Sequence, residues 1–69
     1  MSDTELFQQS FNIAWSVLAR AGELGEPTDT TRFLGERIAD MMRRGERRRL
    51  LLSNLAIEEY RRRPIRLMH

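Results

Sequence analysis

The fold is decided by residues 4–22, which read TELFQQSFNIAWSVLARAG. At about 100° per residue, one compact apolar stripe consists of Phe7, Phe11, Ala14, Leu18 and Ala21, with Trp15 at its edge. A second apolar stripe lies roughly 100° further round the helix and consists of Leu6, Ile13, Val17 and Leu24. The two stripes predict a helix whose apolar arc of about 200° is wider than the ~100° that a surface helix needs.

The width of this arc leaves two interpretations open. The helix is either sandwiched between other helices of its own domain, or it presents one stripe to another chain. Its remaining surface is polar but uncharged and holds Gln8, Gln9, Asn12 and Ser16. Because two partner helices within 69 residues could cover much of the arc, both interpretations are kept.

Helical patterns continue along the chain, and sustained strand-like alternation is missing. We expect an all-α fold, a small three-helix bundle with helices at about 4–22, 29–44 and 46–62. It forms a single helical domain over residues 1–69, with a short irregular tail at 64–69.

Individual residues indicate where these helices begin and end. Ser2 and Glu5 fit a capping box at the start of the first helix. Thr28 or Asp29 is expected to cap the second helix, because a short polar side chain there can accept a hydrogen bond from an unpaired backbone N–H of the first turn. Pro64 is expected to end the third helix, since the residue before a proline is disfavoured in helical geometry.

The break at Gly45 has an alternative. Arg47, Arg48 and Arg49 would place positive charge at the positive end of a separate third helix. Apolar residues also stay in helical phase across the glycine, namely Leu34, Ile38, Met41, Leu52 and Leu55. A helical hairpin with one long helix over 29–62 would satisfy both facts, at a cost of about 1 kcal/mol for an interior glycine.

The short chain favours self-association. A domain of this size buries only roughly 60% of the surface of its unfolded chain, so small domains are usually reinforced by disulfides, a metal or oligomerisation. There is no cysteine, and the one histidine is the final residue, His69. The sequence therefore predicts a homodimer. Its candidate interface residues are those of the second stripe and two residues of the third helix that point away from the main core face: Leu6, Ile13, Val17, Leu24, Leu50 and Ile57.

Charge is divided unevenly along the chain. Residues 1–31 carry a net charge of −4 and residues 32–69 a net charge of +6. Such a split indicates either an acidic partner for the second half or contacts between the two halves, within one chain or between two.

A group of arginines is the main alternative functional candidate. A possible phosphate-binding site would consist of Arg43, Arg44, Arg47, Arg48 and Arg49. Arginine suits phosphate because its planar fork donates two hydrogen bonds at once. Nucleic-acid binders usually add stacking aromatics or polar residues that contact bases, and here the basic half offers only Tyr60 and Asn54.

Catalytic chemistry has few residues to draw on. The chain lacks cysteine and lysine, which removes the usual nucleophile–base pairs. Glu36 and Asp40 share a helix face without a histidine, so a carboxylate metal site is not expected. We expect no enzymatic activity, no cofactor and no metal.

Composition suggests where the protein acts. No apolar run is long enough to span a bilayer, and the N-terminal residues do not resemble a secretory leader, so we expect a cytoplasmic protein without membrane contacts. All twelve basic residues are arginine, which points to a GC-rich and therefore bacterial coding sequence. The hypothesis is a small non-catalytic interaction or regulatory module that forms a homodimer and binds an unidentified protein partner. The alternative is an RNA- or DNA-binding accessory protein that uses the arginine group.

Overall fold

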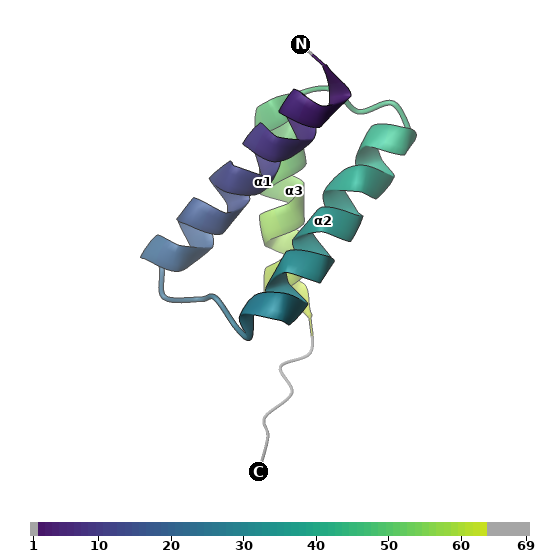
Figure 1. Cartoon of the computed structure of the whole chain (residues 1–69). Coiled ribbons are helices and arrows are strands. Elements are labelled where there is room, and N and C mark those ends of the chain that lie inside the picture. The colour runs from purple at the N-terminus through teal and green to yellow at the C-terminus, as the bar shows by residue number, and fades with distance from the viewer. Residues whose placement is uncertain (1, 64–69) are drawn as a thin grey trace.

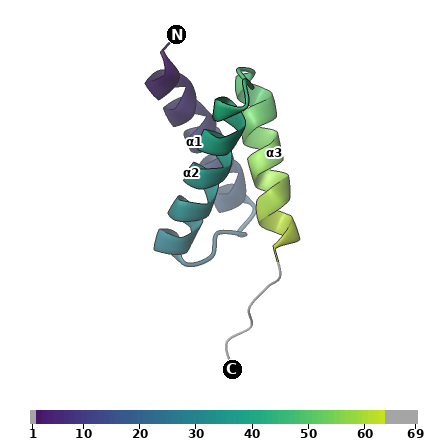
Figure 2. The same ribbon diagram turned by 90° about the vertical axis from the view of Figure 1, so that its right-hand side faces the viewer.

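The computed structural model describes residues 2–63, which form three α-helices (Figure 1). These are α1 (Asp3–Arg20), α2 (Pro27–Arg43) and α3 (Arg49–Arg62). α1 and α3 run in the same direction, α2 runs opposite to both, and every pair of helices is in contact (Figures 1 and 2). No strand occurs in the described part of the chain. The predicted three-helix bundle is therefore confirmed, and the alternative with one helix over 29–62 is wrong.

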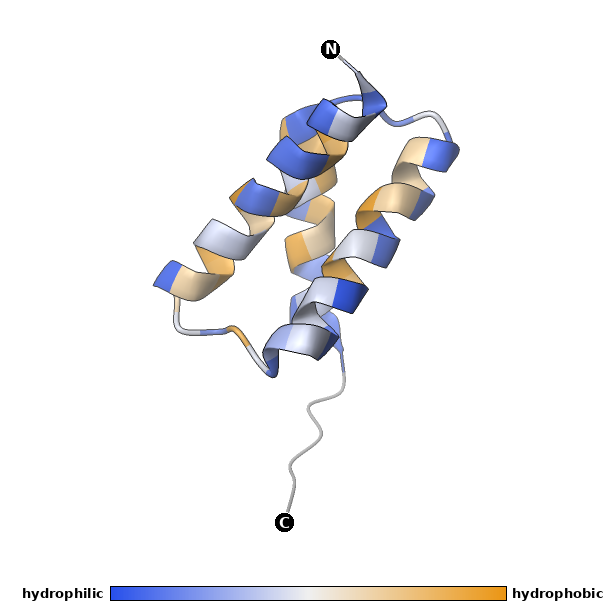
Figure 3. Ribbon diagram, in the orientation of Figure 1, coloured by the Kyte–Doolittle hydropathy of each residue, from blue (hydrophilic) through white to orange (hydrophobic). Residues whose placement is uncertain are grey.

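The core is built from a row of side chains on each helix. The fully buried apolar residues are Ala14, Leu18, Leu34, Ile38, Leu52 and Ala56. Figure 3 shows hydrophobic residues recurring along each helix with hydrophilic residues between them. This is the pattern of a helix with one face buried, so packing stabilises the helices more than the propensity of any single residue does.

Both connections begin with the same glycine turn. Gly22 and Gly45 have φ angles of +70° and +104°, a region that side chains with a Cβ rarely adopt. After each glycine, the next backbone N–H donates to the carbonyl five residues earlier, at 2.8 Å after Gly22 and at 3.0 Å after Gly45. Both turns are Schellman motifs, which satisfy carbonyls left unpaired at the helix end. The predicted break at Gly45 is thereby confirmed.

The start of α1 follows the predicted capping box. The Glu5 N–H donates to the Ser2 hydroxyl at 3.1 Å, and the Ser2 N–H donates to the Glu5 carboxylate at 3.1 Å. The helix ends at Arg20 rather than at residue 22, because Gly22 already belongs to the turn.

The predicted start of α2 is wrong by two residues. The cap is Glu26 rather than Thr28 or Asp29, and the Glu26 carboxylate accepts the Asp29 N–H at 2.7 Å. Pro27 then takes the first helical position, where its fixed φ suits the helix and its missing N–H costs nothing. Because Pro27 suits the first helical position, α2 begins two residues before the predicted start.

The start of α3 also differs from the prediction, lying at Arg49 instead of residue 46. The Glu46 carboxylate accepts the backbone N–H of Arg47 at 3.1 Å and that of Arg48 at 2.9 Å. These bonds hold residues 46–48 in a turn outside the helix. Arg48 at the cap position makes no side-chain capping bond.

Tyr60 of α3 contacts both the α1–α2 loop and the start of α2. Its hydroxyl accepts the Gly25 N–H at 2.7 Å and is hydrogen-bonded to the Thr30 hydroxyl at 2.8 Å. Its ring meets Phe33 edge-on with 5.7 Å between centroids, and the Arg63 guanidinium lies 4.8 Å from the Tyr60 ring. This buried tyrosine of α3 thus joins the α1–α2 loop to the first turns of α2.

Candidate interaction surface

The outer side of α1 carries no charge between residues 6 and 19. Residues 6–19 contain no Asp, Glu, Lys or Arg, although such residues make up 32% of the chain. Burial does not account for this, because part of the stretch is exposed, namely Gln8, Asn12, Ser16, Val17 and Ala19. Exposed helix faces in soluble proteins usually carry charged side chains. The α1 surface is therefore unusual for solvent-facing residues.

α3 extends this uncharged region. Residues 50–57 also lack charged side chains, and Leu50 at the start of the stretch is 63% exposed. Val17 of α1, at 37% exposure, is the other large hydrophobic residue exposed in the described chain.

Helical phase places these apolar residues on the same side of the bundle. On α1, the Phe7 ring faces Gly35 of α2, whereas Ile13 and Val17 lie on the opposite edge of the buried row and therefore beside α3. On α3, Leu55 faces the α2 side, where it lines a hollow together with Met41. Leu50 lies across the buried row of α3 from Leu55 and therefore on the α1 side.

We call this region the uncharged surface. It consists of Gln9, Asn12, Ile13, Ser16, Val17 and Leu50.

Three of the six predicted interface residues lie on the uncharged surface. Leu6 and Ile57 are each 5% exposed and belong to the core of the single chain, so the prediction that Ile57 points away from the core face is wrong, and Leu6 of the second stripe is covered within one chain. The packing of α3 against α1 covers Leu6 of α1 and Ile57 of α3. Leu24 is half-buried and packs against the core from the α1–α2 loop. Ile13, Val17 and Leu50 remain accessible.

An aromatic row follows the other edge of α1. The rings of Phe7 and Phe11 are stacked with centroids 6.2 Å apart, and those of Phe11 and Trp15 with centroids 5.8 Å apart. All three are half-buried and pack against the core. Phe7 lies over Gly35 of α2, where an added Cβ would make an ordinary van der Waals contact with the ring at 3.6 Å. We assign this row to the packing of α1 on α2.

Acceptors within the chain contact every arginine of the predicted phosphate-binding group. Arg43 and Arg44 pair with Asp40 at 3.5 and 3.3 Å. Arg47 pairs with Asp3, Arg48 pairs with Glu46 at 3.0 Å, and Arg49 donates to Gln9 at 2.6 Å. The five cations share three carboxylates, so the net charge of the whole group is +2. All five side chains remain at the surface, where such pairs are weak and a strong anion could compete with them.

Glu46 has the most strongly perturbed acid–base chemistry in the turn. A side-chain hydrogen bond from Arg48 lowers the pKa of Glu46 from 4.5 to about 2, and the backbone N–H of Arg48 and of Arg47 act in the same direction. The same contact raises the pKa of Arg48. The Glu46 carboxylate therefore stays ionised over the physiological range.

Ion pairs join the acidic first half of the chain to its basic second half. Arg47 meets Asp3, Arg61 donates to Glu23 at 2.6 Å, and Arg63 donates to Asp29 at 2.7 Å. Each pair joins an acid of the first half to an arginine of the second. The alternative that one half of the chain faces the other is thus realised within one chain.

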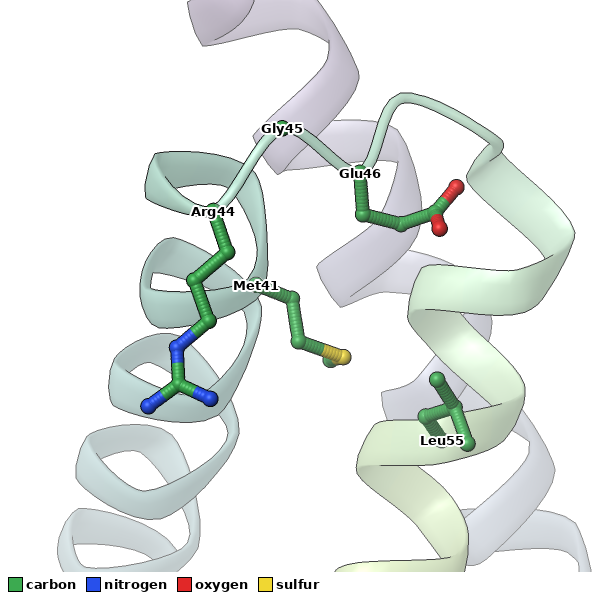
Figure 4. A pocket seen from close by; sticks show the side chains of 5 residues that line it. All are labelled: Met41, Arg44, Gly45, Glu46 and Leu55. Atoms are coloured by element: carbon green, nitrogen blue, oxygen red, sulfur yellow. The ribbon is translucent and has the colours of Figure 1, made fainter.

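Concave sites in the described residues are shallow. One hollow lies beside the α2–α3 turn and is lined by Met41, Arg44, Gly45, Glu46 and Leu55. In Figure 4 the Met41 side chain points from α2 toward Leu55 of α3. A second hollow is lined by four residues at the start of α2: Pro27, Thr28, Thr31 and Arg32. Neither hollow brings together groups that form a catalytic arrangement.

Residues 2–63 also contain no group of three or more side chains able to hold a metal ion. Within the same range, none of the helices combines the length and apolar character needed to cross a membrane. Comparison with protein-family models, curated proteins and solved structures finds no match to this chain.

Proposed function

We propose that this protein is a small non-catalytic interaction module that works as a homodimer and uses the uncharged surface to bind its second copy. The observation that carries the proposal is the absence of charge from residues 6–19 of α1, including the part exposed to solvent. Interface centres are depleted in charged residues relative to the rest of a protein surface. The bacterial cytoplasm, which we infer from composition alone, remains the expected setting.

Burial of exposed apolar side chains supplies the driving force. Val17 and Leu50 are exposed in the single chain at 37% and 63%, and Ile13 lies half-buried beside them. Removing apolar surface from water contributes about 25 cal/mol per Å². A second copy would also compensate for the small core of a chain of this length.

A pair of variants tests the proposal. Val17→Asp places a charge on the uncharged surface, and Thr31→Asp places the same charge at an exposed position of α2, starting from a residue of similar shape. We expect the wild type and Thr31→Asp to be dimers in sedimentation equilibrium at micromolar concentration. Val17→Asp should be a folded monomer, because an unpaired charge in an interface costs several kcal/mol.

Leu18 provides the control for folding. It is adjacent to Val17 but fully buried, so Leu18→Asp should unfold the chain, as seen in the circular dichroism signal. Wild-type protein that sediments as a monomer near 8.2 kDa up to high concentration would contradict the proposal. Equal dimerisation of Val17→Asp and Thr31→Asp would assign the interface to another surface.

A further inference from the structure

We infer that the two copies pair through antiparallel α1 helices that cross near Asn12 and Ile13. This inference rests on the proposed function and specifies its geometry. The evidence is the distribution of charge along the outer side of α1. The uncharged residues occupy the middle of the helix, Glu5 lies at one end of it and Arg20 at the other.

Helical geometry aligns the residues that would meet. At about 100° per residue, Glu5, Gln9, Ser16 and Arg20 fall within an arc of roughly 60° along one side of α1. Ile13 lies beside the same arc. A two-fold axis at the middle of this side would place Gln9 of one copy opposite Ser16 of the second. The hydroxymethyl group of Ser16 is small, which allows the two helices to approach closely.

Charge complementarity selects the antiparallel direction. An antiparallel pair places Glu5 of each copy opposite Arg20 of the other, which gives two ion pairs at the ends of the contact. A parallel pair would place Glu5 against Glu5 and Arg20 against Arg20, and it would also align the two helix dipoles unfavourably. The α1 residues between these ends are uncharged, so within α1 the end residues decide the orientation; the exposed Arg49 guanidinium of α3 lies against Gln9 in either direction.

The surroundings of this side are compatible with the pairing. The Gln9 side-chain oxygen already accepts from Arg49 at 2.6 Å, which leaves the Gln9 amide donors for the Ser16 hydroxyl of the second copy. Arg47 near the same end is neutralised by Asp3. Leu50 of α3 lies on the edge of this contact and would be covered by the second copy.

Cysteine cross-linking tests the direction, because the chain has no cysteine of its own. Gln9→Cys and Ser16→Cys proteins are mixed in equal amounts, oxidised gently and separated by mass. An antiparallel pair brings residue 9 of one copy to residue 16 of the other, within the Cα separation of about 4.4–6.8 Å that a disulfide requires. The same antiparallel pair separates residue 9 of one copy from residue 9 of the other by about 10 Å along the helix axis, and likewise the two copies of residue 16. The mixed disulfide between residues 9 and 16 should therefore dominate.

A charge reversal gives an independent measurement. Arg20→Glu should raise the dimer dissociation constant roughly threefold to thirtyfold, because two exposed ion pairs are lost and become repulsive. Arg32→Glu, at an exposed position of α2, serves as the control and should leave the constant unchanged.

The outcomes separate this inference from the proposed function. Dominant disulfides between two residues 9 or between two residues 16 would overturn the antiparallel arrangement, and so would an unchanged dimer dissociation constant for Arg20→Glu. In either case a dimeric wild type would still support the proposed homodimeric interaction module. A monomeric wild type would overturn both.

Discussion

The two ends of the bundle are fastened by different kinds of interaction. At the end with the α1–α2 loop, the buried Tyr60 hydroxyl bonds to the Gly25 N–H and to the Thr30 hydroxyl. At the end with the α2–α3 turn, exposed arginines pair with carboxylates, as in the contacts of Arg47 with Asp3 and Arg48 with Glu46. The first end also carries exposed ion pairs, those of Arg61 with Glu23 and of Arg63 with Asp29, but only that end adds a hydrogen-bonded group away from solvent.

This difference predicts which end limits stability under given conditions. A buried hydrogen bond is costly to break, because its partners are left without water or protein to bond. Exposed ion pairs typically contribute about 0–1 kcal/mol each and are screened by salt. We therefore expect the buried hydrogen bonds of the tyrosine end to contribute more stability, and the exposed ion pairs, which are the main fastening of the arginine end, to respond more to salt and pH.

The largest expected effect is at the tyrosine end. Tyr60→Phe keeps the ring against Phe33 but leaves the Gly25 N–H and the Thr30 hydroxyl without their partner. The free energy of unfolding should fall by about 1–3 kcal/mol, with little dependence on salt. Urea denaturation at low and high salt measures both effects. A loss below about 0.5 kcal/mol would mean that water replaces the hydroxyl at this site.

The two glycine turns should be equally sensitive, although the ends differ. Gly45→Ala and Gly22→Ala should each destabilise by about 1 kcal/mol, because alanine is disfavoured at positive φ. No atom lies within 4 Å of a Cβ added at either position, so the loss reflects the backbone alone. Gly35→Ala, inside α2, is the control and should not show this loss. A higher melting temperature for Gly45→Ala would contradict the turn.

The pattern of residues predicted the helices better than it predicted their edges. The Ser2 capping box and the break at Gly45 both followed from local signals in the sequence. The start of α3 did not, because it depends on the Glu46 carboxylate accepting two neighbouring amides. Side-chain bonds of this kind leave no periodic trace in a sequence.

The candidate surface was predictable only in part, for a related reason. Helical phase identified Ile13 and Val17 correctly as lying outside the buried row of α1. It could not show that Leu6 and Ile57 are covered, since that depends on how closely α3 approaches α1. Ser10 is fully buried and lies four residues before Ala14, so two small side chains follow one another on the buried row of α1. This spacing can be read from the sequence, and it is consistent with the close approach of the two helices.

At the arginine end, the state of Glu46 should make stability depend on acid pH. Folding lowers the pKa of Glu46 from 4.5 to about 2, because Arg48 donates to its carboxylate. A lowered pKa stabilises the fold above the unfolded value and loses this contribution as the pH falls from about 4.5 toward 2. Glu46→Gln should therefore have a flatter melting-temperature profile than the wild type over this window. Parallel profiles would show that the contact does not persist in solution.

The smallest expected effect on stability is at the three consecutive arginines of the same end. Replacing Arg47, Arg48 and Arg49 by glutamine removes exposed contacts with Asp3, Glu46 and Gln9, so the change in the free energy of unfolding should be small. Loss of cations at the positive end of α3 offsets part of the lost pairing.

The same triple variant examines the nucleic-acid alternative. If these arginines bind phosphates, affinity for random-sequence oligonucleotides must fall with salt, with a log–log slope of about −0.7 to −0.9 per phosphate contacted, and the variant must flatten that slope. We expect no measurable binding by either protein at low salt, because carboxylates of the same chain reduce the net charge of the arginine group to +2 and few aromatic or base-reading residues stand beside it. Salt-dependent binding that the variant abolishes would instead assign the turn to an anionic partner. The uncharged surface on α1 would then serve dimerisation alone.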